Sequence, residues 1–278
     1  MEGIKGIQNT QYPMMETKTI LYKGALIRYC IHGSGRPVML IHGFGEDSSI
    51  WEAQVSYLKE NFLLIVPDLP GSGASEMLRK DDVQIADYAE VMKAILKEEK
   101  INSAVMIGHS MGGYITLQFA KKYPELLNAF GLFHSGAYAD DEEKIRTRKK
   151  AIAFIREKGS KAFLKTSIPG LFYDAEKSKN HIEALIEKGA YFSQEALIQY
   201  YEAMIARPDT TDILKDSVNP ILFIIGEHDK AIPFPHSLQQ AHLPDYAYIH
   251  ILRHSAHMGM LEETGKANTI LAQFLQSA

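Results

Sequence analysis

One serine in this chain stands where a nucleophile would be exposed. The apolar run 103–107 leads through Gly108 and His109 to Ser110, and a helical pattern begins at Met111-Gly112-Gly113. This succession predicts a strand, a sharp turn and a helix, with Ser110 at the tip and glycines that leave room for the turn. A serine hydroxyl attacks a carbonyl only when it lies near a base and near amide donors for an oxyanion. The motif G-x-S-x-G arises by accident in roughly one chain in ten of this length, so its weight comes from the strand and helix around it.

The rest of the chain supplies elements that could position such a serine. Strands are predicted at 20–31, 38–41, 62–66, 104–107, 129–133, 221–225 and 248–252, and helices at 51–61, 83–98 and 114–123, the last of them stopped by Pro124. This alternation predicts a largely parallel sheet with helices on both faces. In such sheets, ligand sites collect at the carboxyl ends of the strands.

The serine motif resembles the nucleophile elbow of the α/β-hydrolases, in which a serine, an acid and a histidine follow one another along the sequence. The resemblance implies an acid just after a later strand, and Asp229 follows 221–225 in the pattern Gly226-x-x-Asp229-x-x-x-Pro233. It also implies a histidine after the last strand. His257 fits, because it opens a His-Met-x-x-x-Glu segment, and His254 is the alternative. Ala256 stands where the family commonly has glycine, which is a small-for-small exchange.

Two further loops match the family. Residues 38–45 have the strand-His-Gly-aromatic form, and the resemblance implies that the amides of Phe44 and Met111 make the oxyanion hole. Residues 68–75 resemble the family's Asp-x-x-Gly-x-Gly-x-Ser turn, to which we assign a structural role beside the site. The five motifs occur in the family's order, and the resemblance extends from about residue 19 to the C-terminus.

The strand rhythm stops between Gly136 and about Lys215, where charged helical segments replace it. The resemblance implies a helical cap here. We therefore expect an α/β-hydrolase fold with a mostly parallel eight-stranded sheet flanked by helices. The expected divisions of the chain are a loose leader at 1–16, with Met14 or Met15 as alternative starts, a core at 17–136 and 216–278, and a cap at 137–215. The apolar stripes of the cap either hold its helices together or face the cleft. The residues expected to contact substrate are Phe172, Tyr173, Phe192, Tyr201 and Met258, and an aromatic rim favours an apolar acyl or aromatic group.

The composition of the chain limits the classes of molecule that it is expected to bind. The net charge of −4 and the absence of a Lys/Arg cluster interleaved with aromatics argue against nucleic acid and anionic lipid. Cys30 is the single cysteine, so no intramolecular disulfide can form, which fits a reducing compartment. No apolar run approaches the roughly 18 residues of a membrane span, and the first residues lack a secretory apolar region. We expect a cytoplasmic protein that acts on a small molecule, and no motif implies a cofactor or metal.

The chemistry expected from these residues is acyl transfer. His257 would take the proton of Ser110 while Asp229 orients the imidazole, giving an acyl-enzyme that water cleaves. A carboxylesterase acting on a small or medium, apolar ester is the first hypothesis. The alternatives on the same triad are an enol-lactonase, a carbon–carbon bond hydrolase and a cofactor-free perhydrolase. An alternative of another class is a low-turnover ligand sensor on this scaffold. The oligomeric state is left open.

Overall fold

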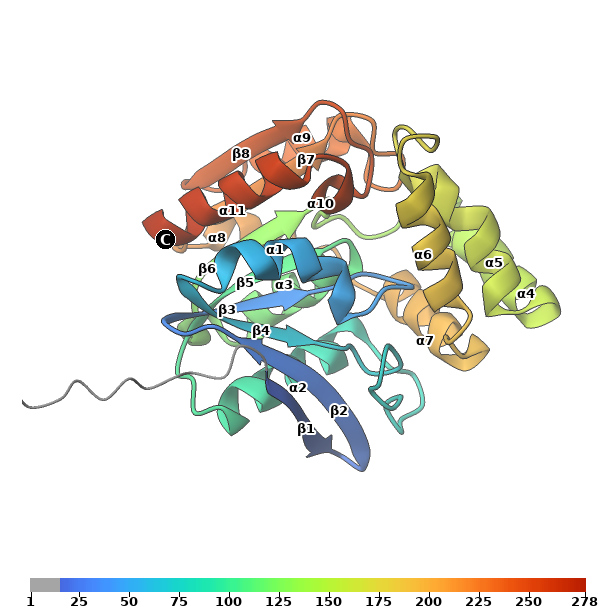
Figure 1. The fold of residues 1–278 in the computed structure, drawn as a ribbon, viewed down its shortest axis with the longest axis horizontal. Helices are drawn as coiled ribbons and strands as arrows, with labels where there is room; N and C mark the ends of the chain where they lie inside the picture. The colour runs from blue at the N-terminus through green and yellow to red at the C-terminus, as the bar shows by residue number, and fades with distance from the viewer. Residues whose placement is uncertain (1–15) are drawn as a thin grey trace, which may run out of the picture.

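A twisted eight-stranded sheet runs through the centre of the molecule in the computed structural model, which describes residues 16–278 (Figure 1). The predicted leader, with Met14 and Met15, lies outside the described residues apart from Glu16. The strands are β1 (Glu16–Tyr22), β2 (Ala25–His32), β3 (Arg36–Ile41), β4 (Phe62–Pro67), β5 (Ala104–His109), β6 (Leu127–Phe133), β7 (Ile221–Gly226) and β8 (Ala247–Leu252).

The strands lie in the order β1-β2-β4-β3-β5-β6-β7-β8. Strand β2 is antiparallel to β1 and to β4, and every other neighbouring pair is parallel. The predicted run at 20–31 is two strands, because Lys23 and Gly24 both take positive φ angles (47° and 84°) and reverse the chain. The mostly parallel eight-stranded sheet expected from the sequence is confirmed.

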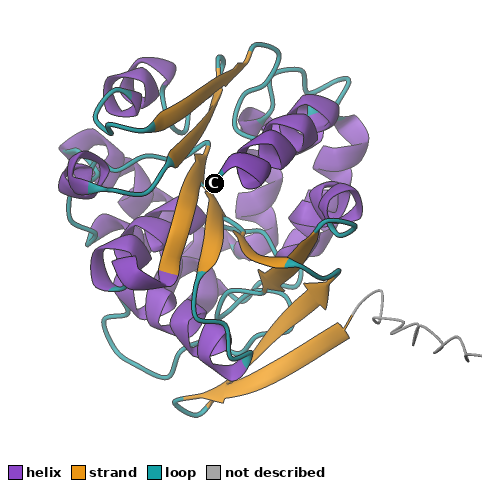
Figure 2. Ribbon diagram, turned by 90° about the vertical axis from the view of Figure 1, so that its left-hand side faces the viewer, coloured by secondary structure: helices purple, strands orange, loops and turns teal. Residues whose placement is uncertain are grey.

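Helices cover both faces of the sheet, as Figure 2 shows. Helices α1 (Glu52–Leu58) and α11 (Thr264–Ser277) pack together on one face, and α2 (Ile85–Glu98) and α3 (Met111–Lys122) pack together on the other. The central strands are buried on both sides, so β5 and β7 consist of buried residues throughout. Helix α3 starts at Met111, directly after the turn at Ser110, as the serine motif predicts and three residues before the helix range 114–123.

The segment between β6 and β7 is helical and lies largely beyond the carboxyl ends of the strands (Figure 1). Its helices are α4 (Glu142–Lys158), α5 (Ser160–Ser167), α6 (Lys179–Gly189), α7 (Gln194–Ile205) and α8 (Thr211–Asp216). Helix α4 packs on α5 and α7, whereas α8 has returned to the sheet and packs against α3. The remaining short α-helices are α9 (Phe234–Ala241) and α10 (Gly259–Glu262), and short 3-10 helices are formed by Ser48–Trp51, Pro124–Leu126 and Ile168–Leu171.

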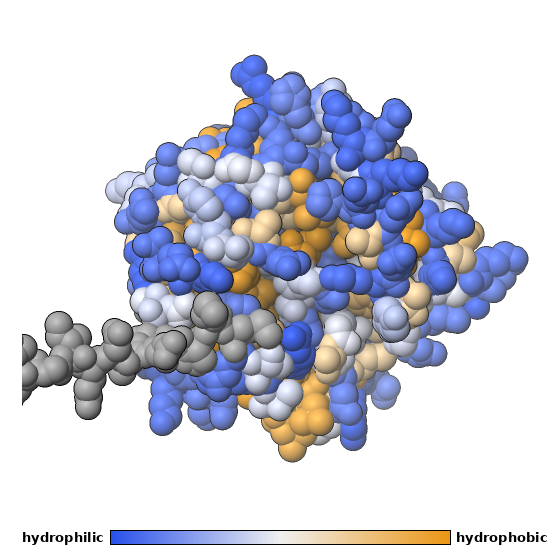
Figure 3. All heavy atoms as spheres, viewed as in Figure 1, coloured by the Kyte–Doolittle hydropathy of each residue, from blue (hydrophilic) through white to orange (hydrophobic). Residues whose placement is uncertain are grey.

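The surface in the view of Figure 3 is mainly hydrophilic, with apolar side chains gathered at its lower edge, where Figure 1 places β1 and β2. Leu21 and Leu26 are paired across these two strands and are exposed. Among residues 16–278, no helix is both long and apolar enough to cross a membrane.

Candidate active site

Ser110 occupies the tight turn between β5 and α3. Its backbone has φ 51° and ψ −117°, a conformation that a residue with a side chain rarely adopts. The turn is held by hydrogen bonds from Ser110 N to Phe133 O (3.0 Å) and from Ser135 Oγ to Ser110 O (2.7 Å). A Cβ added at Gly108 would lie 2.2 Å from Gly112 O, and one added at Gly112 would lie 2.4 Å from Ile41 O. The two glycines are therefore required by close backbone contacts, as their spacing predicts.

Three predicted residues from three different strand ends meet at this turn. His257 Nε2 lies 2.9 Å from Ser110 Oγ, and His257 Nδ1 lies 2.7 Å from Asp229 Oδ2. The other oxygen of Asp229 accepts the N–H groups of Ala231 (2.8 Å) and Ile232 (2.9 Å), which fixes the carboxylate. Burial by itself raises the pKa of Asp229, but the charge and hydrogen bond of His257 outweigh burial and lower that pKa below its ordinary value.

The alternative histidine, His254, lies elsewhere. It is exposed, and its backbone N–H donates to Glu263 Oε2 at 2.8 Å. The structure thus brings His257, and not His254, to Ser110.

The two predicted oxyanion donors border the same turn. Met111 is the first residue of α3, where the N–H groups of a helix lack acceptors within the helix. Phe44 follows β3, and a Cβ added at the preceding Gly43 would lie 3.0 Å from Ser110 Cβ, so this loop rests against the serine. Within residues 16–278, neither the Phe44 N–H nor the Met111 N–H has a hydrogen-bond partner.

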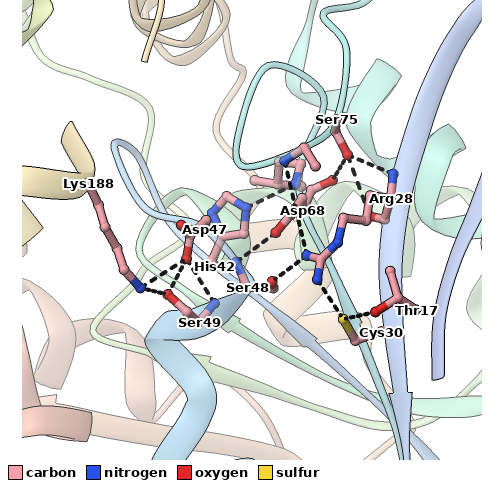
Figure 4. A network of polar contacts seen from close by, with 12 residues as sticks. Thr17, Arg28, Cys30, His42, Asp47, Ser48, Ser49, Asp68, Ser75 and Lys188 are labelled. Carbon is pink, nitrogen blue, oxygen red and sulfur yellow. Dashed lines mark hydrogen bonds and ion pairs between the residues drawn. The ribbon is translucent and has the colours of Figure 1, made fainter. Parts of the chain in front are cut away.

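A polar network braces the loop after β3 (Figure 4). His42 Nε2 accepts the Leu69 N–H at 2.9 Å, which ties the loop to the turn at 68–75. Asp68 accepts hydrogen bonds from Arg28 Nη1 (2.9 Å) and Ser48 N (2.9 Å), and the three residues appear together in Figure 4. The network therefore supports a structural role for the turn at 68–75.

A buried charge pair lies next to the triad. Glu46 Oε2 accepts from Gly43 N (2.7 Å) and contacts His109 Nδ1 (2.9 Å), while His109 Nε2 lies 2.9 Å from the carbonyl oxygen of His257. Both contacts of His109 are acceptors, so both of its ring nitrogens carry a proton and the ring is an imidazolium. This pair connects the loop of Phe44 with the backbone of His257.

His134 is a further buried histidine beside the triad, and it is neutral. Its Nε2 accepts the N–H of Gly259 at 3.1 Å, and its Nδ1 lies 3.8 Å from Asp229 Oδ2, which is too long for a hydrogen bond. Burial lowers the pKa of His134 well below its ordinary value. His134 therefore packs behind Asp229 without adding a charge.

A cavity of about 770 Å³ opens above Ser110 and His257. Part of its wall is apolar, formed by Phe44, Leu171, Tyr201 and Met204, and part carries charged side chains from α4 and from the end of α7. Of the five residues predicted to contact substrate, Tyr201 lines the cavity, where it stacks on Phe44 with ring centroids 4.3 Å apart.

The other four predicted contact residues do not line this cavity. Phe172, Phe192 and Met258 are buried in the hydrophobic core, and Tyr173 is half exposed and stacks on His228. Five residues near the site were not predicted from the sequence as functional: Glu46, His109, Asp140, Arg148 and Arg207. The only sequence signal for these residues is the place of Glu46 and His109 inside the oxyanion-loop and elbow motifs.

The chain is similar in sequence and in fold to known proteins. Residues 36–133 match the family described as the alpha/beta hydrolase fold. An uncharacterized protein of Mycobacterium tuberculosis is 32% identical over 139 residues, which span 50% of this chain and 40% of that relative. A protein of Agrobacterium fabrum, named as a proposed carbamate hydrolase, is 25% identical over 87% of this chain and 93% of its own length.

Among solved structures, a thermophilic esterase from Thermogutta terrifontis, solved with malate bound, superimposes with a TM-score of 0.85 at 26% identity, covering 94% of this chain and 98% of that one. The sheet order, the turn at Ser110 and these matches define the class. The chain belongs to the α/β-hydrolase superfamily.

Proposed function

We propose that this protein is a serine hydrolase that cleaves a carboxylic ester of a small or medium substrate through an acyl-enzyme. The observation that carries the proposal is the unbroken set of hydrogen bonds from Ser110 Oγ through His257 to Asp229 at the floor of the cavity. A hydroxyl in this arrangement can pass its proton to imidazole as it attacks a carbonyl.

In the proposed reaction, Ser110 Oγ bonds to the carbonyl carbon while His257 Nε2 takes the hydroxyl proton. Asp229 holds the Nδ1 proton of His257 and stabilises the imidazolium that forms. His257 then donates its proton to the departing alcohol, and the same residues activate water to release the acid. The Phe44 and Met111 amides, which lack other partners in the described chain, would receive the oxyanion, at about 3–4 kcal/mol per donor.

We also propose that the helices between β6 and β7 act as a cap over this chemistry. Leu171, Tyr201 and Met204 come from this segment and line the cavity, so the cap would supply the apolar surface for the acyl or alcohol group. Excluding water would strengthen the electrostatic interactions at the oxyanion.

The test is hydrolysis of p-nitrophenyl esters from acetate to decanoate by wild type and by Ser110→Ala. We expect turnover that depends on chain length and is lost in S110A while the thermal unfolding temperature stays close to that of the wild type. Turnover equal in the two proteins would exclude Ser110 as the nucleophile.

The relative named as a proposed carbamate hydrolase makes a carbamate the second candidate substrate, because the same acyl transfer would cleave it. A p-nitrophenyl carbamate is therefore added to the series. Cleavage of this member alone would replace ester by carbamate in the proposal.

A further inference from the structure

Part of the cavity wall is a cluster of charges that the proposed chemistry does not use. Asp140 lies between β6 and α4, Arg148 is on α4, and Arg207 follows α7. Asp140 Oδ2 accepts from Arg148 Nε at 2.6 Å, and Asp140 Oδ1 lies 2.9 Å from Arg207 Nη2. The side chains of Asp140 and Arg207 are buried, and the Arg148 side chain is 12% exposed. Two guanidinium groups thus share a single carboxylate.

The two arginines differ in how their donors are used. Arg207 donates to Met204 O (2.7 Å) and Tyr138 O (3.0 Å) and lies 4.0 Å from the Tyr114 ring centroid, so it is held on all sides. Arg148 directs Nε and Nη2 to Asp140. Its Nη1 has no hydrogen-bond partner among residues 16–278, and Arg148 lines the cavity with its guanidinium 5.6 Å from the Tyr201 ring centroid. Nη1 is therefore the donor open to a ligand.

The positive charge here exceeds the negative charge. Arg148 and Arg207 against Asp140 leave an excess of one positive charge. Lys144 lies one turn earlier on α4, also lines the cavity, and donates to the Ala231 carbonyl oxygen at 2.9 Å with no carboxylate within 4.0 Å in the described chain. Buried charge is costly unless it is paired, so an anion in the cavity would be strongly favoured.

The other charges on the cavity wall do not cancel this excess. Four of these charged residues are exposed, so water and salt screen their charges: Asp141, Glu143, Asp209 and Lys230. Two of these acids are already engaged, because Asp141 accepts the Lys144 N–H (2.7 Å) and Asp209 accepts the Thr211 N–H (2.9 Å). Glu46 is paired with His109.

Tyr114 reports the same positive potential. Burial by itself would raise the pKa of its phenol. The charges of Arg207, Lys144 and Arg148 outweigh burial and lower this pKa below its ordinary value.

We propose that Arg148, with Lys144 beside it, forms a subsite that binds a carboxylate, so that the ester attacked by Ser110 carries a second, ionised carboxyl group. The ester half of this inference rests on the proposed function. A carboxylate would accept from Arg148 Nη1 in a charge-assisted hydrogen bond and offset the excess charge. Together with the apolar wall of Phe44 and Tyr201, the subsite describes an amphipathic substrate.

The fold sets the spacing between the two ends of that substrate. Tyr114, which contacts the arginine cluster, follows Ser110 by four residues on α3, a rise of about 6 Å. The carboxylate would therefore be separated from the scissile carbonyl by a short chain. Half-esters of dicarboxylic acids have this form.

The test compares kcat/KM for monomethyl adipate and methyl hexanoate, followed as acid release at constant pH. We expect the wild type to favour the charged ester by about 10- to 100-fold, the range of a hydrogen bond to a charged group. In Arg148→Met this ratio falls by the same factor, mainly through KM, because the carboxylate is bound equally before and during reaction. The series from monomethyl succinate to monomethyl suberate then measures the spacing.

The matched control is Arg146→Met. Arg146 is on the same helix, is 63% exposed at its side chain and does not line the cavity, so R146M should keep the wild-type ratio. If Arg148 were only structural, R148M would slow both esters alike and leave the ratio intact, which would overturn the subsite. Asp140 keeps Arg207 as its partner in R148M, so its carboxylate is not left unpaired. If R148M fails to fold, Arg148→Lys replaces it in the test, and this variant should lose only part of the preference for the charged ester because it retains the positive charge.

A binding measurement separates the failure of the subsite from the failure of the proposed function. Calorimetric titration of S110A with adipate, and of S110A/R148M as its pair, does not depend on turnover. If no ester is cleaved but adipate binds to S110A and not to S110A/R148M, the subsite stands and the ester function fails. If esters are cleaved with no preference for the charged one, the subsite is overturned and the function stands. If neither cleavage nor adipate binding is seen, both are overturned.

Discussion

Replacing Glu46 by glutamine tests whether the buried pair beside Ser110 is ionic. Glu46 Oε2 is 2.9 Å from His109 Nδ1, and His109 Nε2 is 2.9 Å from the carbonyl oxygen of His257. Both ring nitrogens must carry a proton to make these contacts. Glutamine keeps the shape of the side chain and removes the charge that holds the second proton.

We expect E46Q to lower the free energy of unfolding by about 3–5 kcal/mol near neutral pH, the range for a buried pair that loses one partner. Without the carboxylate, the imidazolium of His109 either stays buried and unpaired or gives up a proton. If the proton leaves Nε2, two lone pairs face each other between His109 and the His257 carbonyl. Either outcome is unfavourable, and either loosens the backbone of His257.

The pH dependence follows from the direction of two pKa shifts. Burial lowers the pKa of His109, but the charge and hydrogen bond of Glu46 and the hydrogen bond to the His257 carbonyl together outweigh burial and raise the pKa above 6.5. This stabilisation is therefore complete below pH 6.5 and is lost as the pH rises through the folded-state pKa. Burial raises the pKa of Glu46, but the charge and hydrogen bond of His109 and the hydrogen bond from the Gly43 amide together outweigh burial and lower the pKa below 4.5, so the carboxylate's contribution is complete above pH 4.5. The difference between wild type and E46Q should therefore be largest between pH 4.5 and 6.5.

Urea denaturation at about pH 6 and about pH 9 measures this difference. The control is Glu60→Gln, an exposed carboxylate for which we expect a change within about 0.5 kcal/mol at both pH values. A loss below about 1 kcal/mol for E46Q at pH 6, or an equal loss at both pH values, would refute an ionic pair.

Two further substitutions test the turn and the triad. Asp229→Asn should reduce kcat for p-nitrophenyl esters by about 10⁴-fold. The Ala231 and Ile232 amides require an oxygen at one position, so the NH₂ group of the asparagine would face His257 Nδ1. This contact forces the His257 proton onto Nε2, which then cannot accept the proton of Ser110. Exposed Asp245→Asn is the control, and a loss of less than about 10-fold in D229N would contradict this role for Asp229. Gly112→Ala should destabilise the fold by at least about 1–3 kcal/mol in thermal unfolding, because its Cβ would lie 2.4 Å from Ile41 O. Gly265→Ala, whose Cβ meets nothing within 4 Å, should be neutral or stabilising, and equal unfolding temperatures for the two variants would show that the elbow has room for a side chain.

The fold and the residues nearest to Ser110 were predictable because their signals are local and ordered along the chain. Ser110, Asp229 and His257 each follow an apolar strand, and parallel strands bring their carboxyl ends to one edge of the sheet. The hairpin of β1 and β2 was not resolved from the sequence, since Lys23-Gly24 interrupts the apolar run by only two residues.

The cavity wall was harder to predict because it depends on how helices pack. Phe172 and Phe192 are aromatic residues of the segment between β6 and β7, and the sequence does not distinguish them from an aromatic residue of that segment that lines the cavity, such as Tyr201. In the structure both phenylalanines are buried in the core. Arg148 belongs to a helix rich in exposed charges, and its sequence neighbourhood gives no sign that it is buried on Asp140. Burial of an ion pair is decided by tertiary contacts between residues far apart in sequence.

The contacts at Asp140 and Arg207 also close the base of the segment between β6 and β7. Arg207 reaches Asp140, and Thr210 N donates to Ala137 O at 2.9 Å, so the outgoing and returning chains are joined twice within a few residues. A loop closed at its base imposes little on the sheet beneath it, since doubling the length of a flexible loop costs only about 0.6 kcal/mol of closure entropy. Insertions, deletions and exchanges of whole helices beyond this closure should therefore be tolerated by the sheet, so substrate preference could diverge in evolution while the nucleophile and its partners stay in place.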